Sequence, residues 1–184
     1  MVKKSAGVLL IGVVTILLAF LPRPKTNTSA VSMPTETTTT TVYKVKPKEV
    51  VVSQAQVEKR INYFCNVRQF AKTDCDYIKA LSWLESWWGK CQRIFDSNAK
   101  YSYGIFHYQL ETFIRQGIKY GFLDKDVTKE EAEKKIYDID IQIPLTMCLY
   151  KDKQSQSHWV LSSQKIKKQG LENILKIAYN SVQE

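Results

Sequence analysis

The chain contains few residues of the kinds that hold metal ions or build β-rich folds. It has only two histidines, His107 and His158, and none of its four cysteines stands in a Cys-x-x-Cys pair. These spacings do not match a structural zinc site, so we expect no metal centre and no cofactor. Beyond the valine run 50–52, no segment shows a strand pattern, and no segment repeats. The sequence therefore favours a mainly helical domain.

Apolar residues are concentrated near the N-terminus. The uncharged run 6–21 follows Lys3 and Lys4. Such a run is long for the core of a signal peptide and slightly short for a membrane-spanning helix, which needs about 20 residues. A small-residue cleavage site at 28–30 lies unusually far beyond the run. We therefore predict that residues 1–24 are a signal peptide or, preferably, an N-terminal membrane anchor. The rest of the chain would be extracytoplasmic, either membrane-anchored or secreted.

The next segment, 25–52, is rich in threonine and proline and poor in apolar residues, which predicts a flexible tether. Residues 53–184 then form the folded domain. The whole chain has a net charge of +9, and removing the four cations of its first thirty residues, which contain no acid, leaves +5. This mild basicity suits an anionic cell envelope but is equally typical of a solvated surface. No motif indicates nucleic-acid binding, so we expect no nucleic-acid partner.

All four cysteines lie in the folded domain. An even number of cysteines in an exported chain predicts two disulfides, although free buried thiols are the alternative. Of the three connectivities, we favour Cys65–Cys75, which closes a local turn between two helices. The second bond would then join Cys91, just after the helix that contains Glu85, to Cys148 on a later helix.

Apolar spacing and capping signals predict the helices. Ser53 and Gln56 have the form of a capping box, which predicts a helix over 54–70. Asp74 or Asp76 would cap the next helix, which Gly89 would end. The aperiodic segment 91–108 predicts an irregular loop or a short β-hairpin. Further helices are predicted over 113–121, from the capping box at 128–131, over 141–149 and after Gly170.

Glu85 lies at the edge of the apolar stripe of its predicted helix, so we expect a partly desolvated carboxyl group. A group that protonates a leaving oxygen near neutral pH needs such an environment. The glycine-containing segment 101–106 follows, and its aromatic side chains suit the apolar faces of sugar rings. The pairing is typical of a glycan-cleaving site, although a helix acid by itself is more often a surface residue.

Four short motifs occur in a characteristic order. They are Glu85-Ser86, the segment 102–106 (Ser-Tyr-Gly-Ile-Phe), the segment 140–143 (Asp-Ile-Gln-Ile) and the segment 178–180 (Ala-Tyr-Asn). In this order they resemble the lysozyme-like superfamily, and above all lytic transglycosylases, resuscitation-promoting-factor domains and goose-type lysozymes. The resemblance spans about 57–181. It implies a lysozyme-like helical domain that acts on peptidoglycan glycan strands.

The resemblance also implies roles for individual residues. Glu85 would be the general acid that protonates the glycosidic oxygen between N-acetylmuramic acid and N-acetylglucosamine, and would then act as the base. Ser86 would orient Glu85 by a hydrogen bond, and Tyr179 would contact Glu85. Where this chain has His107, the family commonly has glutamine. The residues expected to line the substrate cleft are Tyr103, Gly104, Ile105, Phe106 and His107.

Two kinds of glycan cleavage stay open. A lytic transglycosylase needs no second carboxylate, because the 6-hydroxyl of the muramic acid attacks the anomeric carbon. A muramidase that uses water does need one. Asp96 is the best candidate for it, but its Asp-Ser-Asn context is also typical of a turn, which favours the transglycosylase. The alternatives to an enzyme are a non-catalytic cell-wall-binding module on the same fold and a disulfide-stabilised helical domain unrelated to glycans.

Overall fold

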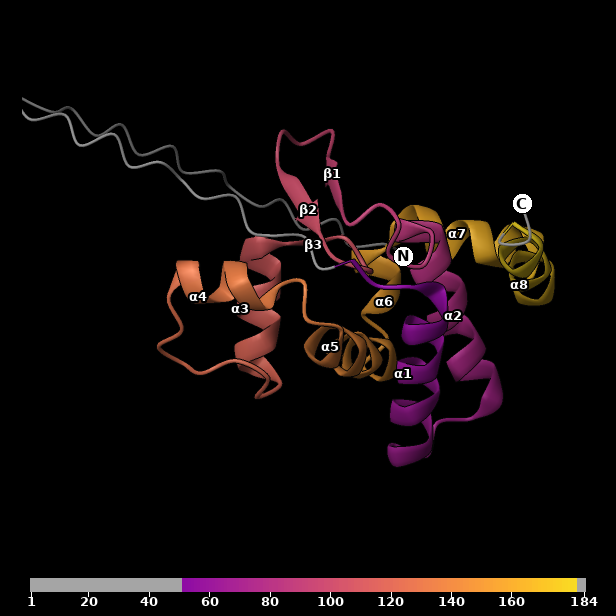
Figure 1. Cartoon of the computed structure of the whole chain (residues 1–184), viewed down its shortest axis with the longest axis horizontal. Helices are drawn as coiled ribbons and strands as arrows, with labels where there is room; N and C mark the ends of the chain where they lie inside the picture. The colour runs from indigo at the N-terminus through magenta and orange to yellow at the C-terminus, as the bar shows by residue number, and fades with distance from the viewer. Residues whose placement is uncertain (1–50, 182–184) are drawn as a thin grey trace, which may run out of the picture. The chain divides into compact units, whose positions relative to one another are not determined.

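A computed structural model describes residues 51–181 (Figure 1). These residues form eight helices and three short strands, which confirms the prediction of a mostly helical fold with a short hairpin. The predicted signal or anchor, nearly all of the predicted tether and the last three residues lie outside the described part. Within 51–181, no helix is both long and apolar enough to span a membrane.

The first two helices, α1 (Gln54–Val67) and α2 (Lys72–Ser86), form a pair that packs side by side (Figure 1). A disulfide between Cys65 and Cys75 joins them across their connection, as the sequence predicted. The predicted capping box of α1 is present: the Ser53 hydroxyl accepts from the Gln56 amide, and the Gln56 side chain accepts from the Ser53 amide.

The end of α2 is sharply defined. Trp87 and Trp88 both have positive φ angles, 51° and 59°, and Gly89 follows at 87°. Three successive left-handed residues cannot continue a right-handed helix. The helix therefore stops at Ser86, and Glu85 stands in its last turn.

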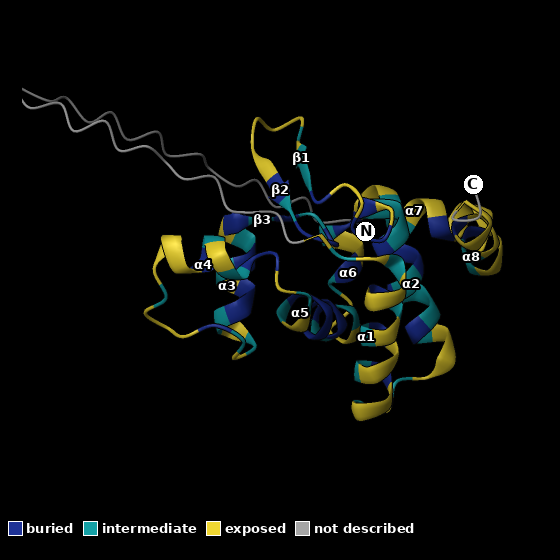
Figure 2. Ribbon diagram, in the orientation of Figure 1, coloured by how far each residue is buried: buried dark blue, intermediate teal, exposed yellow. Residues whose placement is uncertain are grey.

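A small antiparallel sheet follows α2. Its strands β1 (Arg93–Phe95), β2 (Tyr101–Tyr103) and β3 (Tyr108–Gln109) lie in the order β1-β2-β3. Ile94 pairs with Ser102, and Ser102 pairs with Gln109. The β1–β2 hairpin projects from the helices (Figure 1), and its tip is exposed (Figure 2).

Six helices complete the described part. Helix α5 packs against α1, while α7 and α8 pack against α2. Helix α4 begins with the predicted capping box at Thr128 and Glu131. The bounds are α3 (Leu110–Lys119), α4 (Lys129–Lys135), α5 (Ile139–Lys151), α6 (Ser155–His158), α7 (Val160–Gln169) and α8 (Leu171–Asn180).

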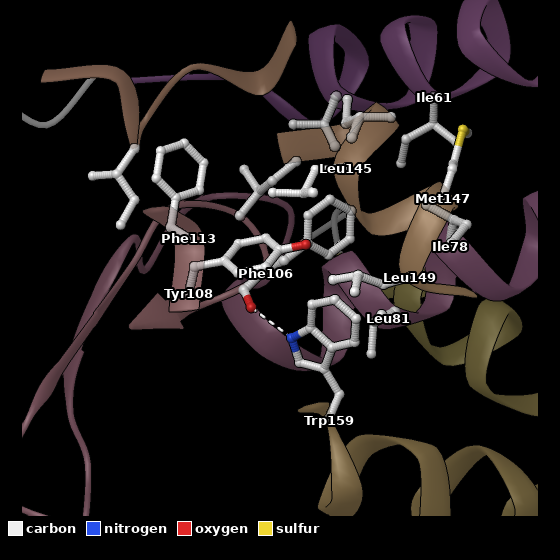
Figure 3. Packing of buried hydrophobic residues seen from close by; sticks show 14 of the residues in the cluster. Ile61, Ile78, Leu81, Phe106, Tyr108, Phe113, Leu145, Met147, Leu149 and Trp159 are labelled. Atoms are coloured by element: carbon white, nitrogen blue, oxygen red, sulfur yellow. Dashed lines mark hydrogen bonds between the residues drawn. The ribbon is translucent and has the colours of Figure 1, made fainter. Parts of the chain in front are cut away.

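The hydrophobic core combines side chains of α1, α2 and α5 with those of the chain around β3. Figure 3 shows Trp159, which precedes α7, packing close to Phe106 and Tyr108. The indole Nε1 of Trp159 donates a 2.7 Å hydrogen bond to the carbonyl oxygen of Phe106. Trp88 is buried in the same core. The fully buried members shown include Ile61, Ile78, Leu81, Phe113, Leu145, Met147 and Leu149.

The second predicted disulfide is wrong, because Cys91 and Cys148 are both free. Cys91 is exposed in the loop after α2, and its thiol lies 3.9 Å from the Arg93 carbonyl oxygen. Cys148 lies on α5, where its sulfur accepts a hydrogen bond from the guanidinium of Arg68, the residue that follows α1. The two thiols therefore have separate surroundings.

Candidate active site

A cleft of about 770 Å³ lies among the hairpin, the end of α2 and the α6–α7 segment. It brings together Glu85 and Asp96, the two carboxylates that the sequence analysis named as candidates. Both histidines of the chain also line it. No lysine or arginine is among its described lining residues. These are Glu85, Ile94, Phe95, Asp96, Ser97, Asn98, Ser102, His107, Tyr108, Gln109, Thr112, Ser157, His158, Trp159, Val160 and Leu161.

The carboxyl group of Glu85 is largely sheltered, with 16% of its side-chain surface exposed. The Ser162 hydroxyl, from α7, donates a hydrogen bond to Oε1. The Nδ1 atom of His107 lies 3.6 Å from Oε2. Glu85 is thus held from two sides and still lines the cleft, which is the arrangement that a positioned proton donor needs.

Ser86 does not orient Glu85. Its buried hydroxyl lies 2.9 Å from the Ile105 carbonyl oxygen and 3.1 Å from that of Ser82, and it accepts a 2.8 Å hydrogen bond from the Gly89 amide. A hydroxyl has only one proton, and these two carbonyl oxygens take it, so none is left to donate to Glu85. Ser86 therefore ties the end of α2 to the loop after β2, and it supports the site indirectly.

Position 104 requires a glycine because the chain there packs closely against the side chain of Gln142. The φ of Gly104 is +77°, and a Cβ atom there would overlap the side-chain amide of Gln142 from α5. Gln142 is fully buried; its Oε1 accepts from the Phe106 amide, and its Nε2 donates to the Ile136 carbonyl. The missing side chain at Gly104 thus lets α5 fix the loop that leads to His107.

Most of the predicted cleft-lining residues point elsewhere. Side chains alternate along a strand, and because Ser102 lines the cleft, Tyr103 points to the other face and packs on Tyr137. Ile105 and Phe106 are fully buried in the core. Of this predicted group, only His107 lines the cleft.

Asp96 closes the hairpin turn with its backbone and lines the cleft. Its backbone closes the hairpin turn through bonds with Lys100 and Ala99. Its side chain does not serve the turn: Oδ2 accepts from the Ser102 hydroxyl and from Gln109 Nε2, at 3.0 Å for the latter. The sheet therefore holds this carboxylate on the same cleft as Glu85.

Tyr179 lies away from the cleft lining. Its ring packs on Trp88 with ring centroids 5.9 Å apart. Burial, together with a hydrogen bond to Glu58 of α1, raises the pKa of Tyr179. Instead of the expected contact with Glu85, Tyr179 joins α8 to α1 through Glu58 and to Trp88, two residues beyond the end of α2.

Among the lining or contacting residues that were not singled out from the sequence for this site are Ser162, Trp159 and His158. The ring of His158 lies on α6, with its Nε2 3.3 Å from Gln116 Nε2. Burial, and secondarily Arg115, lowers the pKa of His158, so the neutral ring is favoured. None of the three belongs to a local motif, because each reaches the cleft only through the packing of α6 and α7.

Comparisons of the chain with protein-family models, with curated proteins and with solved structures find no match. Among residues 51–181, no three or more acidic, histidine or cysteine side chains gather in a way that could hold a metal ion. The cleft itself and the order of the motifs are therefore the features that point to a function.

Proposed function

We propose that the protein cleaves the β-1,4 bond between N-acetylmuramic acid and N-acetylglucosamine in peptidoglycan, with Glu85 as general acid and then base. The observation that carries the proposal is the sheltered Glu85 carboxyl on a cleft of about 770 Å³. The hydrogen bond from Ser162 positions this carboxyl group, and a cleft of this size accommodates sugar rings. The order of the sequence motifs supports the same reaction.

In the favoured route, Glu85 gives its proton to the glycosidic oxygen as the bond to the anomeric carbon breaks. The 6-hydroxyl oxygen of the muramic acid then bonds to that carbon, and its proton passes to Glu85. The products are a 1,6-anhydro end and a free 4-hydroxyl, and Glu85 returns to its starting state. This lytic transglycosylase reaction consumes no water and needs no second carboxylate.

A second route is favoured by one observation, the side chain of Asp96 on the same cleft. Carboxylates on such a cleft can activate water or attack the sugar, which would make the protein a muramidase. The hydrogen bonds from Ser102 and Gln109 would hold the Asp96 carboxyl group in place for that role.

The experiment is digestion of purified peptidoglycan by the full-length chain, with the fragments analysed by mass. Anhydro ends are lighter than reducing ends by one water molecule, so the two routes give different masses. Anhydro ends support the transglycosylase, and reducing ends support the muramidase. An absence of fragments, from a folded protein over a range of pH, would refute cleavage and leave a wall-binding module.

We also propose that the domain acts outside the cytoplasm, either secreted or attached to the membrane through its N-terminal segment. The support is the apolar run 6–21 with its flanking lysines, together with the Cys65–Cys75 disulfide, a bond typical of oxidising compartments. Fractionation of cells that express the chain would test this.

A further inference from the structure

The cleft and the rest of the protein differ in their charged groups. Glu85 and Asp96 give the cleft two carboxyl groups, and within residues 51–181 no lysine or arginine lines it. The chain as a whole has the opposite balance, with a formal net charge of +9. The charge of the cleft is therefore a local property, and it bears on the ligands that the cleft accepts.

Two cations of the β1–β2 hairpin are directed away from the cleft. Arg93 pairs with Tyr103 in the sheet and is stacked on Tyr101, with its Cζ atom 3.9 Å from the ring centroid. This face of the sheet is opposite to the one on which Ser102 lines the cleft. Lys100, in the turn, donates a 2.6 Å hydrogen bond to a carboxylate on α3. Neither cation is thus placed to neutralise an anion in the cleft.

The first turn of α7 is a further feature to consider, because the N-terminal end of a helix carries partial positive charge. Val160 and Leu161 of this turn line the cleft. The turn already faces Glu85, whose Oε1 accepts a hydrogen bond from the Ser162 hydroxyl. A ligand carboxylate at this helix end would therefore compete with the carboxyl group of Glu85.

The two histidines do not replace a cation. The Nε2 atom of His107 lies 2.7 Å from the Cys91 carbonyl oxygen, and its Nδ1 atom lies 3.6 Å from Glu85 Oε2. Both ring nitrogens therefore face oxygen atoms of the protein. Burial, and secondarily Arg115, lowers the pKa of His158, which favours its neutral ring. Neither ring offers a free positive group to a ligand.

The remaining lining suits an uncharged sugar. Apolar side chains at the edge of the cleft can contact the faces of sugar rings, and among them Leu161 is 81% exposed. Hydroxyl and amide side chains can exchange hydrogen bonds with sugar hydroxyl and acetamido groups. The polar uncharged lining residues are Ser97, Asn98, Ser102, Gln109, Thr112 and Ser157.

Muramic acid carries a group whose charge depends on the state of the glycan. Its lactyl carboxyl group is an uncharged amide where a peptide stem is attached, and a free carboxylate where the stem has been removed. Because the bond to be cut belongs to the muramic residue, this group enters the cleft with it. A carboxylate that leaves bulk water without a cation or a free donor is disfavoured, whereas an amide is tolerated.

We propose that the cleft selects muramic residues whose lactyl carboxyl group is amidated, so that the protein cuts strands that carry peptide stems and discriminates against strands stripped of them. This inference rests on the proposed function and adds the chemical state of the substrate to it. The two carboxyl groups of the described lining, with no lysine or arginine beside them, carry the preference. It requires no group that binds the peptide itself.

The first test uses one preparation of stripped glycan strands in two charge states. An amidase removes the stems and leaves a carboxylate on each muramic residue. Coupling to methylamine with a carbodiimide then turns these carboxylates into neutral amides without restoring the stems. The wild-type full-length chain should cut the amide strands about tenfold faster or more, because a carboxylate close to like charges is strongly disfavoured.

The outcomes separate the inference from the proposed function. Equal rates on the two strands, or faster cutting of the carboxylate strands, would overturn the inference and leave the proposed function in place. Cutting of stem-bearing peptidoglycan but of neither stripped strand would also overturn it, because the stem itself would then be recognised. If none of the three substrates is cut, the proposed function fails and the inference falls with it.

The second test places a cation in the cleft. Leu161→Lys adds the charge at an exposed lining position, and Leu161→Gln is the uncharged control at the same position. The quantity compared is the ratio of the rates on amide and carboxylate strands, so a general loss of activity cancels. Leu161→Lys should lower this ratio by about fivefold at low salt, the effect of one opposite charge about 4 Å away in water. Equal ratios in the two variants would overturn charge as the cause of the preference.

Discussion

The contact between Gly104 and Gln142 leads to a sharp prediction about stability. In Gly104→Ala, the new Cβ atom would lie 2.7 Å from Gln142 Oε1 and closer still to the rest of the amide group. Gln142 is fully buried on α5, so it has little space to move. It must give up the hydrogen bonds to the Phe106 amide and the Ile136 carbonyl.

The cost has two parts. Placing alanine in the left-handed region at φ +77° costs about 1–2 kcal/mol. Leaving two buried backbone groups without partners costs about 1–3 kcal/mol each. The free energy of unfolding should therefore fall by about 3–8 kcal/mol, which lowers the Tm of a domain of this size by on the order of 10 °C or more.

Gly121→Ala is the matched control. Gly121 has a similar φ of +73°, but no atom lies within 4 Å of the position that a Cβ atom would take. It therefore carries only the dihedral cost of about 1–2 kcal/mol, and both variants share the same loss of entropy in the unfolded chain. Urea unfolding followed by circular dichroism measures both. Equal losses in the two variants would refute the argument that Gln142 requires a glycine at position 104.

Three further predictions concern the site and the thiols. Glu85→Gln should lower cleavage by about 10²–10⁴-fold or more while Tm changes little, because the amide keeps the shape and lacks the proton; full activity in the folded variant would rule out Glu85 as the acid. Asp96→Asn should leave turnover within a few-fold and the products with anhydro ends; a loss of several orders of magnitude together with reducing ends would establish the muramidase route. Cys91 should alkylate readily without reductant, whereas Cys65 and Cys75 should not; mass spectrometry of the unreduced protein checks this, and an unreactive Cys91 would contradict its free, exposed state.

Helix starts were predictable where the capping signal is local. The capping boxes at Ser53 and Thr128 were predicted because each needs only a partner three residues away. The start of α2 was not, since neither Asp74 nor Asp76 caps it. Asp74 instead accepts a hydrogen bond from Tyr150 and, with burial as the larger cause, raises the pKa of that tyrosine to about 12. A tertiary contact with Tyr150 therefore uses the Asp74 side chain, which the local pattern had predicted as a helix cap.

The position of Glu85, the catalytic candidate, could be predicted from the helical periodicity of the sequence. Glu85 was expected at the edge of the apolar stripe of its helix, and its sheltered side chain on the cleft agrees with that expectation. Its partner Ser162 was not predictable, because it lies 77 residues later on another helix and carries no motif. The second disulfide was wrongly predicted for a similar reason. An even number of cysteines does not indicate which thiols lie close together in the fold.

The segment from Tyr103 to His107 shows why a pattern of glycine and aromatic residues could not by itself divide core from cleft. Apolar and aromatic side chains suit a packed core as well as a sugar face. Here the bend at Gly104, fixed by Gln142, lets Ile105 and Phe106 enter the core while His107 turns to Glu85. The core residues of this segment thus determine where the imidazole stands. A substitution that loosens Gln142 should therefore disturb the Glu85–His107 pair as well as the fold.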